Sequence, residues 1–158
     1  MGYSPQELAD RAEIHDVIIR YGWAIDTKDW SLLDSCFTDD AHVDYSSNPG
    51  GKVGPYREVR GWLEKVLSAF PVTQHLMANI DVRLDGDRAT CRTMVTNPQG
   101  AATRTAGLHF FFVGGRYDDE LVRTDAHEGV TLLIKGSRFM RMERVVVALA
   151  GVAADGSH

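Results

Sequence analysis

The sequence predicts an α+β domain in which three helices come early and pack on one face of a mostly antiparallel sheet. Before Pro71, apolar residues recur mainly at helical spacing; after it, the chain runs in strand-like segments that glycine-containing turns separate. Helices followed by strands is an order typical of an α+β fold. Glycines inside the last two segments (Gly114, Gly115 and Gly136) favour bulges or bends. We therefore expect a strongly curved sheet that the helices close into a cone.

The first helix is predicted from Pro5 to about residue 26. Ser4 is a suitable N-cap, proline suits the first helical position, and Glu7 places an acid in the first turn. Apolar residues then recur with a period of 3.6 as far as Ile25. This pattern indicates a helix with one buried face.

Two more helices and one strand are expected before residue 71. The segment WSLLDSCF (30–37) has apolar residues at helical spacing, and AHVDYSS (41–47) alternates like a strand. A third helix should begin at Pro55, fill one face with apolar residues and end before Pro71.

The rest of the chain is predicted to form the sheet. A turn at Asp85-Gly86 is expected to join the strands on either side of it into a hairpin. Residues 97–106 are expected to form a loop or flap. We expect one domain over residues 1–150 and a disordered tail over 151–158. The strands are expected at residues 72–84, 88–96, 107–124 and 130–149.

Composition narrows the possible partners. The chain has 158 residues, a net charge of −5 and a pI of about 5.6, which argues against a nucleic-acid partner because such domains usually carry a basic surface. It contains no run of 18 apolar residues and no signal-peptide pattern, so we expect a cytoplasmic protein without a membrane partner. Cys36 and Cys91 are expected to be buried free thiols. No metal or nucleotide motif occurs, so no cofactor and no metal are expected.

Two polar residues lie at the border of the buried face of the first helix. On a helical wheel centred on Ile18, Tyr21 falls roughly 60° to one side and Asp26 roughly 80° to the other. Asp26 can be a helix-end carboxylate or an N-cap for the next helix. Alternatively, it reaches into a cavity between helix and sheet and has a buried partner there.

Two histidines and a tyrosine in the strand segments are candidates for the same cavity. His75 falls on the strand face that also carries Met77 and Asn79; it is either a solvent-facing histidine or, if this face lines a cavity, a general base. His109, beside three phenylalanines, is either a buried, hydrogen-bonded histidine or a pocket residue. Tyr45 falls on the inner side of its strand, where its hydroxyl needs a partner.

Three segments resemble a known family. RYGWAIDTKDWSLLDSCFTDDAHVDYSS (20–47), TQHLMANI (73–80) and GGRYDDELVRT (114–124) are similar to the SnoaL-like branch of the NTF2-like superfamily, and especially to the scytalone dehydratases and related Asp-His lyases within it. The resemblance covers roughly residues 5 to 145. It implies a cone-shaped NTF2-like fold, also called a cystatin-like α+β barrel, and a homodimer or homotrimer.

The resemblance also implies roles for single residues. Asp26 matches an aspartate that orients the catalytic histidine of these lyases, and His75 matches that histidine, the base. Tyr45 and Tyr21 match tyrosines that hold a substrate oxygen. One position departs from the pattern: Asn97 or Pro98 stands where scytalone dehydratases carry a second catalytic histidine.

These matches lead to a functional hypothesis. We expect a cofactor-independent lyase that carries out a dehydratase-type elimination on a small hydrophobic or cyclic substrate. An isomerase, a polyketide cyclase and a non-catalytic binding subunit remain alternatives on the same scaffold. The residues expected to bind substrate are Trp23, Met77, Asn79, Asn97, His109 and Phe110. Further apolar walls are expected from Trp62, Phe70, Met94, Phe112, Met140 and Met142.

Overall fold

The fold is α+β, as predicted from the order of the segments. The computed structural model describes residues 2–102, 108–124 and 131–141. Its helices are α1 (Pro5–Thr27), α2 (Trp30–Asp34) and α3 (Tyr56–Leu67). No helix in the described ranges is long and apolar enough to cross a membrane. The predicted tail over residues 151–158 lies outside these ranges.

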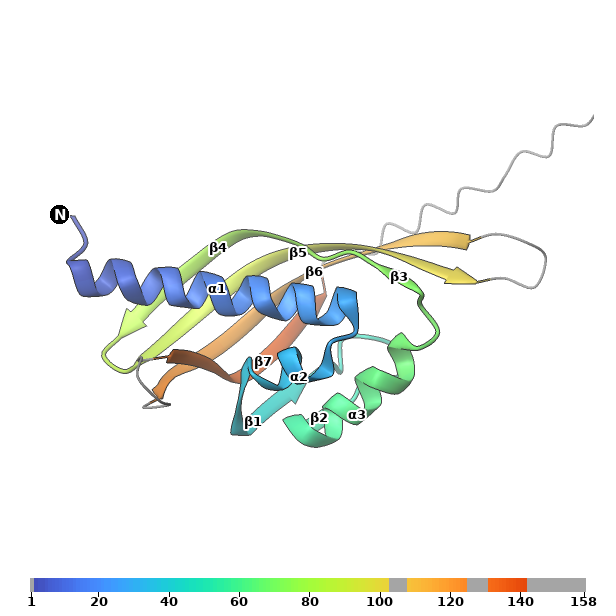
Figure 1. The fold of residues 1–158 in the computed structure, drawn as a ribbon, viewed down its shortest axis with the longest axis horizontal. Helices are drawn as coiled ribbons and strands as arrows, with labels where there is room; N and C mark the ends of the chain where they lie inside the picture. Colours follow the sequence, from blue (N-terminus) through green and yellow to red (C-terminus); the bar gives the residue numbers. More distant parts are fainter. Residues whose placement is uncertain (1, 103–107, 125–130, 142–158) are drawn as a thin grey trace, which may run out of the picture.

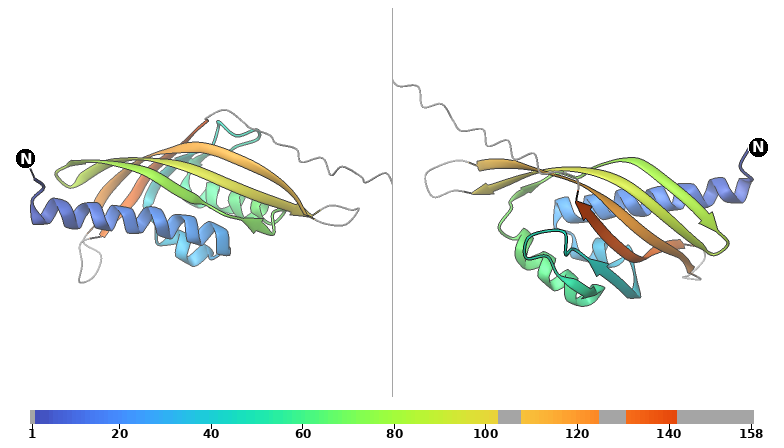
Figure 2. Two further views of the ribbon diagram at one scale, coloured as in Figure 1. Left: turned by 90° about the horizontal axis from the view of Figure 1, so that it is seen from above. Right: turned by 180° about the vertical axis from the view of Figure 1, so that it is seen from behind.

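The strands form one mostly antiparallel sheet. Their order is β2-β1-β7-β6-β5-β3, and β4 also pairs with β5; the contact between β1 and β7 is parallel. The helices lie on one side of this sheet, with α1 running along it (Figures 1 and 2). The strands are β1 (Phe37–Asp44), β2 (Val53–Pro55), β3 (Val72–Thr73), β4 (Leu76–Asp85), β5 (Arg88–Ala102), β6 (Leu108–Thr124) and β7 (Thr131–Arg141).

Helix α1 begins and ends with identifiable caps. The Ser4 side chain accepts a hydrogen bond from the Glu7 backbone N–H, and the Glu7 carboxylate accepts one from the Ser4 N–H, which completes a capping box. At the other end Lys28 adopts the left-handed conformation (φ 60°, ψ 28°) and its backbone N–H donates to α1 carbonyls. The chain therefore leaves the helix two residues after Asp26.

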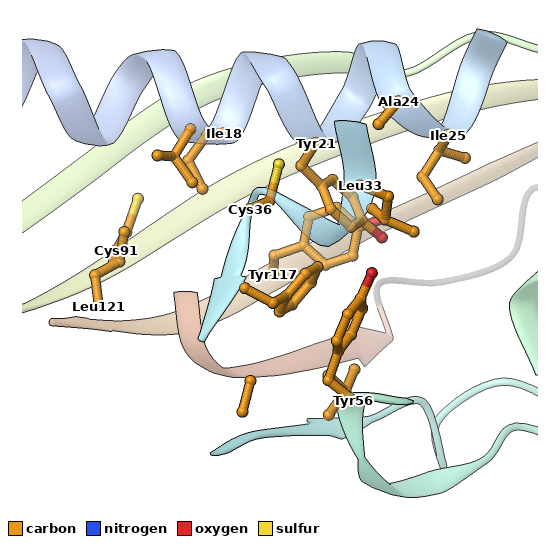
Figure 3. Packing of buried hydrophobic residues seen from close by; sticks show 14 of the residues in the cluster. Ile18, Tyr21, Ala24, Ile25, Leu33, Cys36, Tyr56, Cys91, Tyr117 and Leu121 are labelled. Atoms are coloured by element: carbon orange, nitrogen blue, oxygen red, sulfur yellow. The ribbon is translucent and has the colours of Figure 1, made fainter. Parts of the chain in front are cut away.

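The buried face of α1 packs on the inner face of the sheet. Ile14, Ile18 and Ile25 are almost fully buried, and Figure 3 shows Ile18 and Ile25 pointing from the helix toward the strands. Burial of each such side chain stabilises the fold by about 1.5–3 kcal/mol. This packing fixes the distance between α1 and β4–β6, where the polar residues gather.

Several predicted boundaries were wrong; the strand expected over residues 72–84, for example, is split into β3 and β4, with His75 between them. The second helix ends at Asp34, because Phe37 already belongs to β1. Residues 97–102 are not a loop but continue β5, since each of them pairs with a residue of β6 and Gly100 also pairs with Val72 of β3. Pairing on both sides outweighs the weak strand propensity of proline, glycine and alanine there.

Candidate functional site

Asp26, near the end of α1, and His75, in the link between β3 and β4, form a hydrogen-bonded pair. The imidazole Nδ1 lies 2.7 Å from Asp26 Oδ1, and the His75 backbone N–H donates to Asp26 Oδ2, also at 2.7 Å. The His75 side chain is only 5% exposed and that of Asp26 16%. Two hydrogen bonds to one carboxylate fix both the position of the backbone and the orientation of the ring.

The sequence around the pair explains its geometry. Asp26 lies in the last turn of α1, and Gly22 one turn earlier lets β4 approach, since His75 Cβ lies 3.5 Å from where a Gly22 Cβ would be. Burial by itself would raise the pKa of Asp26. Hydrogen bonds from the His75 side chain and backbone, attraction to His75 and a hydrogen bond from Thr73 outweigh it, so that the pKa lies below its ordinary value. The carboxylate is therefore ionised at neutral pH.

Asn97 of β5 is hydrogen-bonded to the second ring nitrogen of His75, Nε2. Its Nδ2 lies 3.0 Å from His75 Nε2, and its Oδ1 accepts a hydrogen bond from the Gln74 backbone N–H at 3.3 Å. Because a backbone N–H can only donate, this contact assigns the amide oxygen and leaves Nδ2 to donate to Nε2. The ring is thus a neutral imidazole with its proton on Nδ1, facing Asp26.

Three tyrosine hydroxyls gather beside the pair. Tyr21 of α1 is hydrogen-bonded to Tyr45, which follows β1, and it also interacts with Tyr117 of β6, whose ring centroid lies 5.4 Å away (Figure 3). Burial raises the pKa of Tyr45 to about 12 and holds those of Tyr21 and Tyr117 well above 10. All three remain neutral hydroxyls around neutral pH. Because the hydrogen bonds among them use two of their three protons, a ligand oxygen can accept from one hydroxyl of this cluster unless the cluster rearranges.

His75 and the tyrosines line a cavity of about 280 Å³ between the helices and the sheet. Among its described lining residues there is no carboxylate, lysine or arginine, and His75 is the one imidazole. The remaining walls are apolar or carry amides. They are Ile25, Asn48, Pro49, Trp62, Leu63, Val66, Leu67, Phe70, Val95, Asn97, Gln99, Phe111 and Val113.

Some residues expected to bind substrate do not line this cavity; Trp23 and Met77 instead line a second hollow with Asp26 and His75. Trp23 is 63% exposed, because it stands two positions after Tyr21 and so roughly 200° round the helix from it. Asn79 is exposed at a bulge of β4 with φ 49°, where strand alternation breaks down. Met77 packs against Gly22 and the core and is not among the residues that line the cavity.

On the adjacent strands β5 and β6, the residues predicted to face the cavity lie on the outer face of the sheet. Phe110 and Phe112 are 45% and 44% exposed, because Phe111 pairs with Gln99 and therefore shares the inner face. Met94 lies between the buried Thr93 and Val95 on β5, so its side chain is on the outer face. The side chains of His109 and Met140 and the whole of Met142 lie outside the described part of the chain.

Other cavity residues were not predicted. Tyr117 stands in the polar run RYDDE, and Phe111 is the middle of three phenylalanines. Both follow from one signal, the period-2 pattern Phe111, Val113, Gly115, Tyr117 on a single face of β6. Asn48 and Gln99 gave no signal, since amides in turns and at strand ends are common.

Fold and site together define a class of protein: an α+β domain whose helices and sheet enclose a cavity with a carboxylate-bound imidazole in its wall. The chain belongs to the family of SnoaL-like domains, whose family model matches residues 6–128. An uncharacterized protein of Mycobacterium tuberculosis (strain H37Rv) is 40% identical over 121 residues, which cover 77% of this chain and 80% of that protein.

Solved structures share the fold. A hexachlorocyclohexane dehydrochlorinase (LinA type 2) superposes with a TM-score of 0.75 at 18% identity, covering 96% of this chain and 97% of that one. A candidate scytalone dehydratase of Novosphingobium aromaticivorans gives a TM-score of 0.71 at 19% identity, covering 86% and 87%. At this identity the likeness shows the fold alone.

Proposed function

We propose that the protein is a cofactor-independent lyase in which Asp26 and His75 act as a general base on a small hydrophobic or cyclic substrate. The observation that carries the proposal is the direction of the hydrogen bonds around His75. Nδ1–H faces an ionised carboxylate, so Nε2 holds the lone pair on the side of the cavity. An imidazole in this state is ready to accept a proton.

The elimination needs only groups that the site contains. His75 Nε2 removes a proton from a carbon next to a carbonyl, after the substrate displaces the Asn97 amide. The electron pair of the broken C–H bond moves onto the carbonyl oxygen, where the hydroxyls of Tyr21, Tyr45 and Tyr117 stabilise the negative charge. The enolate then re-forms the carbonyl and a carbon–carbon double bond, while the C–O bond to the hydroxyl on the next carbon breaks and the imidazolium gives its proton to the departing oxygen, forming water.

Asp26 contributes in two ways. Its hydrogen bond to Nδ1 selects the tautomer, and its negative charge stabilises the imidazolium that forms during the reaction. General base catalysis of this kind contributes about 10²- to 10⁴-fold to a rate.

The cavity limits the substrate. Its volume of about 280 Å³ is near the lower end of the range of small-ligand pockets, roughly 300–1,000 Å³. Aromatic walls from Trp62, Phe70 and Phe111 suit a flat ring, and the lack of a cationic side chain among the described lining residues favours a neutral substrate over a carboxylate or phosphate.

Double-bond isomerisation is the second candidate. It is favoured by the presence of a single imidazole in the described lining, because one base can remove a proton from one carbon and return it to another. The same intermediate with charge on the carbonyl oxygen serves both reactions.

Mass spectrometry after incubation in D₂O with a panel of neutral cyclic β-hydroxy ketones and enones tests the proposal. Loss of one water supports elimination, and deuterium at carbon without other mass change supports isomerisation or reversible proton removal. His75→Gln should lower either activity by about 10²- to 10⁴-fold. His15→Gln is the matched control, since His15 is exposed on α1. Ligand binding without either product would favour a non-catalytic binding subunit.

A further inference from the structure

Behind the Asp26–His75 pair lies a lysine that the proposed reaction does not use. Lys28 Nζ donates to Thr73 Oγ1 at 2.7 Å and to the Ile25 carbonyl at 3.0 Å. Thr73 is buried, and its hydroxyl helps to lower the pKa of Asp26. An ammonium group can only donate, so Thr73 accepts from Lys28 and keeps its own proton for another partner. Lys28, Thr73 and Asp26 thus form one polar cluster beside His75.

The backbone of Lys28 supports a role for its side chain. Lys28 ends α1 in the left-handed conformation, with φ 60° and ψ 28°. Glycine adopts this conformation without the steric cost that a Cβ brings, and it is the commonest residue at helix ends of this kind. A lysine at this position is strained, yet its side chain is half-buried and held by two hydrogen bonds.

The charges around His75 show what the lysine can do. Asp26 and Lys28 carry opposite charges, so the cluster is neutral while His75 is neutral. Burial lowers the pKa of Lys28, and attraction to Asp26 opposes this effect. The other titratable groups that face His75 are the neutral hydroxyls of Tyr21 on α1 and of Tyr45 and Tyr117 across the cavity; β5 presents the uncharged Asn97.

We propose that Lys28 is a positioning residue whose charge, held by Thr73 beside Asp26, keeps His75 in its neutral, proton-accepting form at neutral pH. With Lys28 present, protonation of His75 creates a net positive charge in a largely buried site, which burial disfavours. Without Lys28, the same protonation would neutralise Asp26 and would be favoured. The inference rests on the proposed function, in which neutral His75 is the base.

The titration of His75 tests this without any substrate. The full chain carries six histidines, and His75→Gln identifies the His75 signals in ¹H–¹⁵N NMR spectra. In Lys28→Met the midpoint of the His75 titration should move to higher pH by about one unit, which is a tenfold tighter hold on the proton. Lys28→Arg should leave the midpoint near the wild-type value, because the charge is kept.

Two further variants separate the charge from other effects. Lys65→Met makes the same change in net charge at an exposed site on α3 and should not move the midpoint. Lys28→Gly removes the charge while relieving the backbone, so thermal stability should be kept while the midpoint still rises. Equal midpoints in Lys28→Met, Lys28→Gly and Lys65→Met would overturn the inference.

The outcome is distinguishable from failure of the proposed function. If Lys28→Met moves the titration but no substrate in the panel loses water or exchanges a proton, the lyase proposal fails and the effect of Lys28 on His75 stands. If wild-type enzyme is active, the acid limb of its pH–rate profile should move to higher pH in Lys28→Met. If the enzyme is active but Lys28→Met changes neither its pH–rate profile nor the His75 titration, the lyase proposal stands and the proposed role of Lys28 is excluded.

Discussion

Gly22 and His75 are in contact across the gap between α1 and β4, where a Cβ on Gly22 would lie 3.5 Å from His75 Cβ and 3.5 Å from Met77 Cγ. A methyl group fits at this distance, but a larger side chain does not. Gly22→Ala should therefore keep the activity and raise stability by up to about 1 kcal/mol, since alanine is the better helix former.

Gly22→Val should instead push β4 away and separate His75 from Asp26. We expect a loss of at least about 100-fold in the proton-exchange activity. At Gly61 of α3 no atom lies within 4 Å of an added Cβ, so Gly61→Val is the control and should leave the activity unchanged. Equal activities of the two valine variants would show that the contact at Gly22 is not needed.

Replacing the carboxylate of the pair should change both catalysis and titration. In Asp26→Asn the negative charge that favours imidazolium is lost, so the midpoint of the His75 titration should move to lower pH. The amide can also present its NH₂ group to Nδ1 and select the wrong tautomer, so activity should fall nearly as far as in His75→Gln. NMR titration and the D₂O assay measure the two effects, and a solvent-like, unchanged titration would contradict the coupling.

The raised pKa values of the buried tyrosines predict a loss of stability at alkaline pH. The pKa of Tyr45 is about 12, and Tyr21, Tyr56 and Tyr117 are also raised well above 10. Because the folded protein holds these protons more tightly than the unfolded chain, the stability they provide is complete below about pH 10 and is lost as pH rises toward 12 and above. Ultraviolet titration should show tyrosinate formation from these four residues only together with unfolding.

An ion pair ties the start of α1 to β6. Arg123 Nη2 lies 2.8 Å from Asp10 Oδ1, and the Asp10 side chain is 7% exposed. Burial alone would raise the pKa of Asp10, but hydrogen bonds from Gln6 and Arg123 hold it below its ordinary value. Its stabilising effect is therefore present above about pH 4 and lost below.

Arg123→Met should lower the free energy of unfolding at pH 7 by roughly 2 kcal/mol, because a buried carboxylate loses a charged partner. Arg83→Met, which removes an exposed arginine on β4, should cost far less. Urea unfolding at pH 7 and pH 3 measures both, and the difference between the variants should shrink at pH 3.

We also propose that the chain forms homo-oligomers through the outer face of β4–β6. Leu76 is 54% exposed, and the register places it on the same face as Phe110 and Phe112. A patch of this kind usually marks an interface. Sedimentation should give a dimer or trimer for wild type and a smaller species for Phe110→Ser/Phe112→Ser. Leu8→Ser, at the far end of α1, is the control for an exposed leucine.

How much of the site could be predicted depended on the kind of residue. Asp26 and His75 could be named because helix and strand periodicity, together with the resemblance to a family, placed both near one cavity. The three phenylalanines of β6 could not be assigned to a face, since alternation gives two choices and the pairing of Gln99 with Phe111 decides between them. Asn79 was misplaced because a bulge between Ala78 and Asp81 breaks the alternation of β4.

The amide of Asn97 gives the site a further property. Since Asn97 already satisfies His75 Nε2, a ligand that only fills the apolar cavity gains affinity from burial but leaves this hydrogen bond in place. A ligand that reacts must first replace this hydrogen bond, so that its own proton faces His75 Nε2. Tight binding and turnover are therefore separate demands on a molecule, and the strongest binders found in a screen need not be substrates.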